Sequence, residues 1–149
     1  MRIINDVIEQ INHTNFEQET QTQEILAQEL DKILDALLTS SEDISAAIIS
    51  SVDGHSKAQR LEADMDEHRF AAMSSALLAL SDNLASEGGK GNTENVLIEG
   101  TNGKIFLLHA GPNHLLTVFT HNCGSLGMPL AYAKQATEQI AALMEVLAS

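Results

Sequence analysis

Four side chains of types that bind metal ions lie close together in the second half of the sequence: His109, His114, His121 and Cys123. Imidazole nitrogens and thiolates are common Zn²⁺ ligands, but a zinc site needs a defined ligand spacing and convergence. No standard spacing occurs, and His109 and His114 fall on opposite strands of an expected hairpin. We therefore expect no cofactor. A metal- or ligand-binding domain that uses His109, His121 and Cys123 is kept as an alternative.

A second polar group, Asp64, Asp66, Glu67 and His68, precedes or begins an expected helix. Capping and the helix dipole explain carboxylates at such a position. Ser74 and Ser75 share that helix with His68, but no G-x-S-x-G motif accompanies them. Gly88-Gly89-Lys90-Gly91 lacks both the spacing of a phosphate-binding loop and the Ser or Thr that follows its lysine. The sequence predicts no enzyme.

The composition limits the classes of partner. The 149 residues suffice for one domain, and 44% apolar but only 3% aromatic residues predict an aliphatic core. A formal net charge of −13 repels nucleic-acid phosphates and anionic lipids, so neither is an expected partner. A single cysteine allows no intrachain disulfide, and neither a signal peptide nor a membrane span is evident. We expect a cytoplasmic protein.

Apolar periodicity and turn residues predict the elements. Ile4, Val7, Ile8 and Ile11 indicate a short amphipathic helix, and the polar stretch His13–Gln23 is either a linker or a solvated helix extension. The remaining elements are a helix over Thr22–Ser40, strands over Ile44–Ser51 and Ser56–Glu62 around the turn Asp53-Gly54, a helix over Asp66–Ser86, strands over Asn95–Glu99, Lys104–Ala110 and Leu115–His121, and a helix that begins at Gly127-Met128-Pro129. Hairpin connections predict an α+β fold with an antiparallel sheet and the order αββαβββα.

The helix over Asp66–Ser86 has more apolar circumference than a helix on a sheet needs. Its apolar stripe consists of Phe70, Met73, Leu77, Leu80 and Leu84, and a face of small residues, Ala72, Ala76 and Ala79, lies beside it. The apolar arc is roughly twice the 100° that one buried face requires. Small residues allow close approach of a second backbone, which favours a symmetric helix contact in a dimer. Other helices of the same chain could instead cover the excess.

Several segments, taken in order, resemble the roadblock family, which is named after dynein light chains. They are residues 44–54 (ISAAIISSVDG), 66–76 (DEHRFAAMSSA), Val96-Leu97-Ile98-Glu99-Gly100, Asn102-Gly103, Leu115-Leu116-Thr117-Val118 and Leu126-Gly127-Met128. The resemblance covers about residues 22–148. It implies a five-stranded antiparallel sheet with the central helix on one face and the terminal helices on the other. Residues 1–21 are then an N-terminal extension to a domain of residues 22–149.

The resemblance also implies a dimer, formed by the central helix and the third strand into one continuous sheet. The expected interface residues are Ala72, Ala76, Ala79, Val96, Leu97, Ile98 and Glu99. Members of this family include MglB-type regulators of small GTPases, and they commonly bind Ras-like GTPases or motor components. We expect a dimeric adaptor or GTPase regulator with no nucleotide pocket of its own. A structural scaffold or motor-associated subunit is the alternative.

The polar sector of the same helix offers a candidate surface for the partner. Its residues are His68, Ser75, Asp82 and Ser86, with Arg69 beside them. Whether the dimer is made of identical chains, and which GTPase it binds, does not follow from the resemblance.

Overall fold

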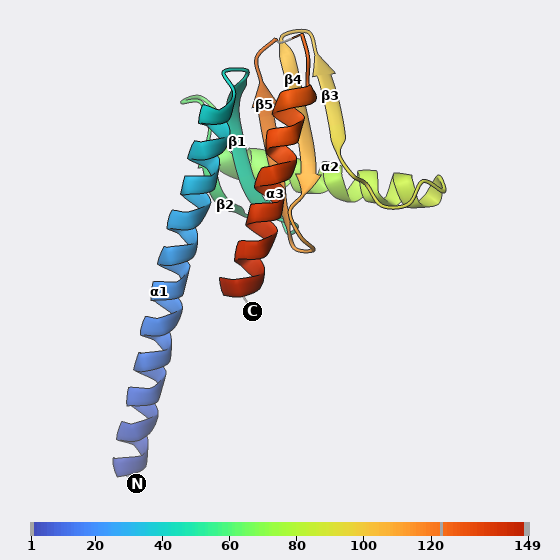
Figure 1. The fold of residues 1–149 in the computed structure, drawn as a ribbon. Coiled ribbons are helices and arrows are strands. Elements are labelled where there is room, and N and C mark those ends of the chain that lie inside the picture. Colours follow the sequence, from blue (N-terminus) through green and yellow to red (C-terminus); the bar gives the residue numbers. More distant parts are fainter. Residues whose placement is uncertain (1, 123, 148–149) are drawn as a thin grey trace.

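The computed structural model describes residues 2–122 and 124–147, which form three helices and five strands (Figure 1). In chain order these are α1 (Arg2–Ser40), β1 (Ile44–Ser51), β2 (Ser56–Arg60), α2 (Glu67–Glu87), β3 (Val96–Gly100), β4 (Gly103–His109), β5 (His114–Thr120) and α3 (Gly127–Leu147). The predicted order αββαβββα is confirmed. The strand β1 has the predicted bounds, whereas β2 ends at Arg60 rather than at Glu62.

The five strands form one antiparallel sheet in the order β2-β1-β5-β4-β3. The β1–β2 connection turns at Asp53-Gly54, as the sequence predicts, and Gly54 has a φ of 90°. A Cβ atom at Gly54 would lie 3.4 Å from the Cα atom of Ala72 in α2. Glycine therefore serves two purposes here, because it accepts the positive φ and lets the hairpin approach the central helix closely.

The two faces of the sheet carry different helices, as the resemblance implies. The helices α1 and α3 cover one face, and α2 covers the other. Adjacent residues of β5 illustrate the alternation, since Leu115 packs on the α2 side and Leu116 on the α1/α3 side. The larger core, between the sheet and the terminal helices, includes Leu30, Leu34, Leu37, Ile49, Phe106, Leu116, Val118 and Ile140. Aliphatic side chains dominate it, as the composition predicts.

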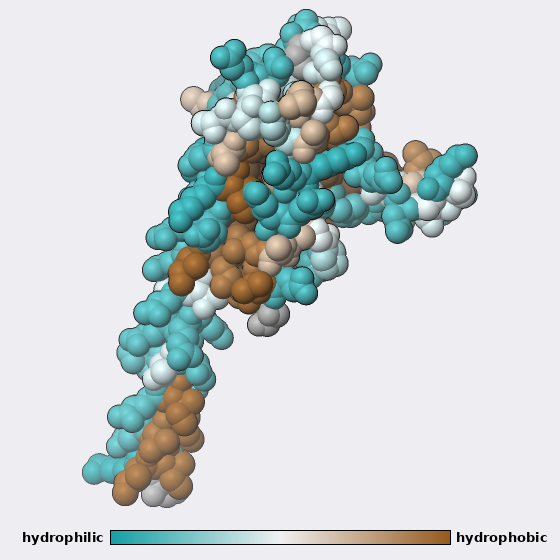
Figure 2. Space-filling view, in the orientation of Figure 1, coloured by the Kyte–Doolittle hydropathy of each residue, from teal (hydrophilic) through white to brown (hydrophobic). Residues whose placement is uncertain are grey.

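The helix α1 (Arg2–Ser40) is continuous, so His13–Gln23 is a solvated helix extension rather than a linker. The expected boundary between residues 21 and 22 falls inside this helix. All side chains from residue 2 to residue 21 are exposed, and this half projects away from the sheet (Figures 1 and 2). A helix without a core to face needs no apolar periodicity, which is why the sequence pattern left two interpretations open. None of the described helices is both long and apolar enough to cross a membrane.

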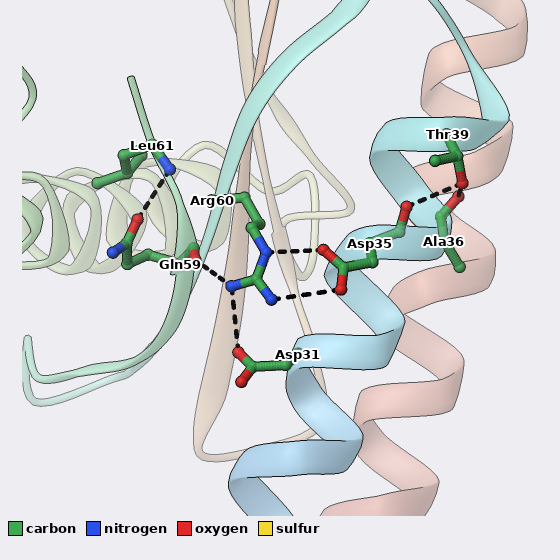
Figure 3. A network of polar contacts seen from close by, with 7 residues as sticks. All are labelled: Asp31, Asp35, Ala36, Thr39, Gln59, Arg60 and Leu61. Atoms are coloured by element: carbon green, nitrogen blue, oxygen red, sulfur yellow. Dashed lines mark hydrogen bonds and ion pairs between the residues drawn. The ribbon is translucent and has the colours of Figure 1, made fainter. Parts of the chain in front are cut away.

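The second half of α1 is tied to the edge strand β2 by Arg60 (Figure 3). The guanidinium Nε donates to Oδ1 of Asp35 at 2.7 Å, and Nη1 donates to Oδ1 of Asp31 at 3.3 Å and to the Gln59 carbonyl at 2.8 Å. The hydrogen bond from Arg60 holds the pKa of Asp35 below its usual value. This fork holds the edge strand β2 against the helix that covers it.

Candidate functional site

The helix α2 begins at a well-formed cap and lies firmly on the sheet. Oδ1 of Asp66 accepts hydrogen bonds from the backbone N–H groups of His68 at 3.0 Å and Arg69 at 3.3 Å. The residues of α2 that are buried against the sheet are Ala71, Ser74 and Leu78. Phe70 packs edge-to-face on Phe119 of β5, with ring centroids 5.4 Å apart. The inner face of α2 is therefore satisfied by its own chain.

The outer face of α2 is apolar and uncovered. Ala72, Ala76 and Ala79 are exposed along it. Beside them Leu80 is 65% and Leu84 73% exposed. Large neighbouring apolar side chains that a folded domain leaves open to water mark an interaction surface. The excess apolar circumference that the sequence predicts is thus not covered by α1 or α3, which lie on the opposite face of the sheet.

The strand β3 is the edge of the sheet next to this face. Among the described residues it pairs only with β4, so its other side presents unpaired backbone groups. Leu97, Ile98 and Glu99 are exposed, and Val96 is half-buried. The C-terminal turns of α2, which carry Leu84, extend past this edge (Figure 1). The free edge and the projecting helix end together form a step that a second sheet could fill.

The polar flank of α2 divides into internal and exposed residues. The Ser75 hydroxyl donates to the Val52 carbonyl in the β1–β2 turn, and Asp82 pairs with His109 at the end of β4. His68, Arg69 and Ser86 are exposed. Ser75 and Asp82 thus help to position α2 on its own domain. The sequence could not show this, because Val52 and His109 are distant in the chain.

The Asp82–His109 pair has a defined geometry. Nε2 of His109 lies 3.0 Å from each carboxylate oxygen of Asp82. Burial is the largest single influence on the pKa of Asp82 and acts to raise it, but the hydrogen bonds to the carboxylate, that from His109 foremost, and the charge of His109 together outweigh it, so the pKa lies below its usual value. The carboxylate is therefore ionised near neutral pH and serves as a fixed anchor for the imidazole. Nothing in this pair resembles a nucleophile with its base.

The three histidines considered as metal ligands have different positions and contacts. His109 is bound to Asp82, His114 begins β5, and His121 is exposed after β5. Cys123 lies outside the described residues. Among the residues that the structure does describe, no three His, Cys, Asp or Glu side chains come together in a group that could hold a metal ion.

Comparisons with known proteins agree with this architecture. The sequence profile of the Roadblock/LC7 domain matches residues 30–120. Protein MJ1340 of Methanocaldococcus jannaschii is 32% identical over 106 residues, which cover 71% of this chain and 92% of that protein. The solved structure of Myxococcus xanthus MglB is similar to this chain, with a TM-score of 0.75 at 19% identity. The matched region covers 81% of this chain and 91% of the MglB chain. A Roadblock/LC7 domain from Streptomyces avermitilis has a TM-score of 0.71 at 20% identity, with coverages of 77% and 97%. At these identities the two structures show a shared fold.

Proposed function

Because this chain belongs to the Roadblock/LC7 domain family, we propose that it forms a homodimer through α2 and β3 and regulates or localises a Ras-like small GTPase. The observation that carries the proposal is the step formed by the exposed apolar face of α2 and the free edge of β3. The GTPase as partner is what the family resemblance implies. The proposed role is one of binding and needs no catalytic site on this chain.

The dimer would satisfy both exposed features at once. Pairing of β3 with β3 of a second copy gives the unpaired edge its missing hydrogen bonds and joins two sheets into one. The second sheet then lies beneath the projecting turns of α2, where Leu80 and Leu84 are exposed. Fully burying a leucine side chain contributes about 1.5–3 kcal/mol. The small Ala72, Ala76 and Ala79 would let the two α2 helices approach closely.

The partner surface would lie on the polar flank that the dimer leaves open. His68 and Ser86 are exposed there, near the start and the end of α2, whereas Arg69 is exposed on the outer face, seven residues before Ala76 and so on the same side of the helix. In a symmetric dimer these residues appear twice, on a platform made by both central helices. If this platform bound one nucleotide state of a GTPase more tightly, it would shift the population towards that state. A cytoplasmic location is part of this proposal, since Ras-like GTPases act there.

A pull-down from the native cell tests the partner. The full chain is immobilised and offered lysate that contains either GDP or a non-hydrolysable GTP analogue, and bound proteins are identified by mass spectrometry. We expect a Ras-like GTPase to be enriched with one of the two nucleotides. Bait with His68→Glu, on the polar flank of α2, should lose it, whereas bait with Lys134→Glu, an exposed residue of α3, should retain it. Recovery of no protein partner under gentle conditions would contradict the proposal.

The alternative is a structural scaffold or motor-associated subunit that makes no GTPase contact. It uses the same dimer and differs only in what the platform holds. Recovery of a partner that is independent of the added nucleotide and contains no GTPase would favour it.

A further inference from the structure

The exposed half of α1 carries a continuous seam of uncharged side chains. Its residues recur at alternating spacings of three and four: Ile4, Val7, Ile11, Thr14, Gln18, Gln21 and Ile25. This is the a/d spacing of a heptad repeat, which places successive residues on one face of a helix. The charged residues of the same stretch, Arg2, Asp6, Glu9, Glu17, Glu19 and Glu24, all occupy other positions. The seam is apolar at its start, polar but uncharged in the middle, and apolar again at Ile25.

The seam has no partner within its own chain. Ile4 is 64%, Val7 47% and Ile11 53% exposed. The hydrophobic atoms gather at the free end of α1, clear of the sheet (Figure 2). A solvated helix in which Ile, Asn and Thr recur has little intrinsic stability in water, because these residues are weak helix formers. A packing partner along the seam would account for the helix.

We propose that this seam binds the same seam of a second copy, as a parallel, in-register two-stranded coiled coil. The arrangement is self-complementary because each seam residue contacts the same residue of the second helix. Ile4 and Ile11 each pack on the equivalent isoleucine of the partner helix, and Gln18 and Gln21 each face a glutamine. An antiparallel pair would instead set isoleucines against glutamine or threonine side chains over much of the seam.

The positions that flank the seam support the parallel arrangement. In a parallel pair, each residue before an a position approaches the residue five places later on the other helix. These approaches join Ile3 to Ile8, which extends the apolar contact, and Glu17 to Thr22. The approach of Glu24 to Glu29 does bring like charges together, but it lies at the end of the seam next to the domain, where Lys32 pairs with Glu29 at 3.0 Å. An anionic membrane surface is disfavoured as the occupant, since five of the six charged residues of residues 2–24 are acidic.

The coiled coil is independent of the proposed α2/β3 dimer. The helix α1 packs on β1 and β2, and β2 is the edge of the sheet opposite to β3. In a dimer joined at β3 the two α1 helices lie at the far ends and cannot reach each other. Pairing of α1 therefore joins one dimer to another, and the chain carries two separate two-fold contacts that build assemblies larger than a dimer.

The oligomeric mass of the full chain tests the proposal. We compare the wild type, by light scattering, with the double variant Ile4→Lys/Ile11→Lys and with the matched control Asp6→Lys/Glu9→Lys, whose changes lie off the seam. The seam variant should have about half the mass of the wild type or less, because like charges would face each other at two layers. The control should keep the wild-type mass. Equal masses for the seam variant and the wild type would overturn the proposal.

A disulfide tests the orientation. In a Cys123→Ser background, Val7→Cys places one thiol on the seam near the start of α1, and Glu9→Cys places one on the opposite side. Under mild oxidation, Val7→Cys should form a covalent dimer and Glu9→Cys should not, since only the parallel register brings the two copies of position 7 within disulfide distance. If the seam variant has half the mass but Val7→Cys forms no disulfide, the parallel arrangement is overturned.

Discussion

At the scale of single residues, the α2 side of the sheet contains a hydroxyl that has no hydrogen-bond partner among the described residues. Thr117 of β5 is 1% exposed, and its Oγ1 atom is unpaired. A buried hydroxyl without a partner lowers stability, and valine has the same shape without the polar atom. We predict that Thr117→Val stabilises the domain by about 1 kcal/mol. Urea unfolding at a fixed protein concentration measures this, and a lower midpoint for the variant would contradict it.

A second residue-scale prediction concerns pH. Burial, and then the positive charge of Lys57, lower the pKa of His114 from its ordinary value of 6.5. As the pH falls below about 6.5 the unfolded chain takes up this proton first, so acidification favours unfolding. Stability should therefore decrease between about pH 7 and pH 5, and His114→Gln should weaken that dependence. The measurement is the thermal midpoint of both proteins across this range; equal slopes would contradict the prediction.

The sequence could not predict hydrogen bonds between residues that are distant in the chain. The helical pattern correctly placed Ser75 and Asp82 on one side of the central helix. It could not show that Val52 and His109 bind them, because these residues lie 23 and 27 positions away. The bonds of Arg60 to Asp31 and Asp35 likewise leave no local signal in the sequence.

At the scale of elements, the exposed outer face of α2 allows a sharp test of the dimer. Ala76 is exposed in the single chain, so a glutamate there should not disturb the fold itself. In the proposed dimer the same carboxylate would be buried without a partner, which costs several kcal/mol. We predict that Ala76→Glu weakens self-association through α2 and β3 on the order of 100-fold or more and leaves the thermal midpoint of the separated chain intact.

Sedimentation of the Ala76→Glu variant measures the change. The matched control is Ala142→Glu, an exposed alanine of α3 on the other face of the molecule. Unchanged association of Ala76→Glu would remove the outer face of α2 from the interface.

The tie between β2 and α1 gives a second prediction at this scale. Removing the guanidinium by Arg60→Ala leaves β2 held by its ladder with β1 and by the packing of Ala58 in the core, so its amide groups should exchange with solvent a few-fold faster. Lys57→Ala on the same strand removes an exposed lysine and should leave the exchange of β2 unchanged. Hydrogen exchange read by mass spectrometry compares the two variants. If Arg60→Ala exchanges like the wild type, the fork does not hold the edge strand.

The elements themselves were largely predictable. Asp53-Gly54 marked the first hairpin, and the mostly apolar, β-rich run Ile44–Ser51 gave β1 its observed bounds. The sequence left two interpretations open at His13–Gln23, because a polar segment that packs on nothing within its own chain offers no apolar period to recognise. It also could not tell which part of the wide apolar arc of α2 faces the sheet, since that is decided by the shape of the surface beneath it.

At the scale of the whole molecule, two unsatisfied surfaces lie at opposite edges of one sheet. The step of α2 and β3 is at one edge, and α1 leaves the domain beside the other. A protein with a formal net charge of −13 should stay dispersed unless specific contacts join it. Its apolar surface is nonetheless concentrated where a second copy can cover it. This distribution is typical of a protein whose binding surface forms only when several copies associate.

The distance between two copies of β3 tests the central claim most directly. A spin label at Glu99→Cys in a Cys123→Ser background lies near the proposed two-fold axis, and a label at Glu138→Cys on α3 lies far from it. Pulsed electron paramagnetic resonance should find the first pair within about 20 Å, as adjacent strands require, and the second pair further apart. The short distance should disappear when Ala76→Glu is added. Absence of any short distance at position 99 in the associated protein would contradict a dimer built on β3 and α2.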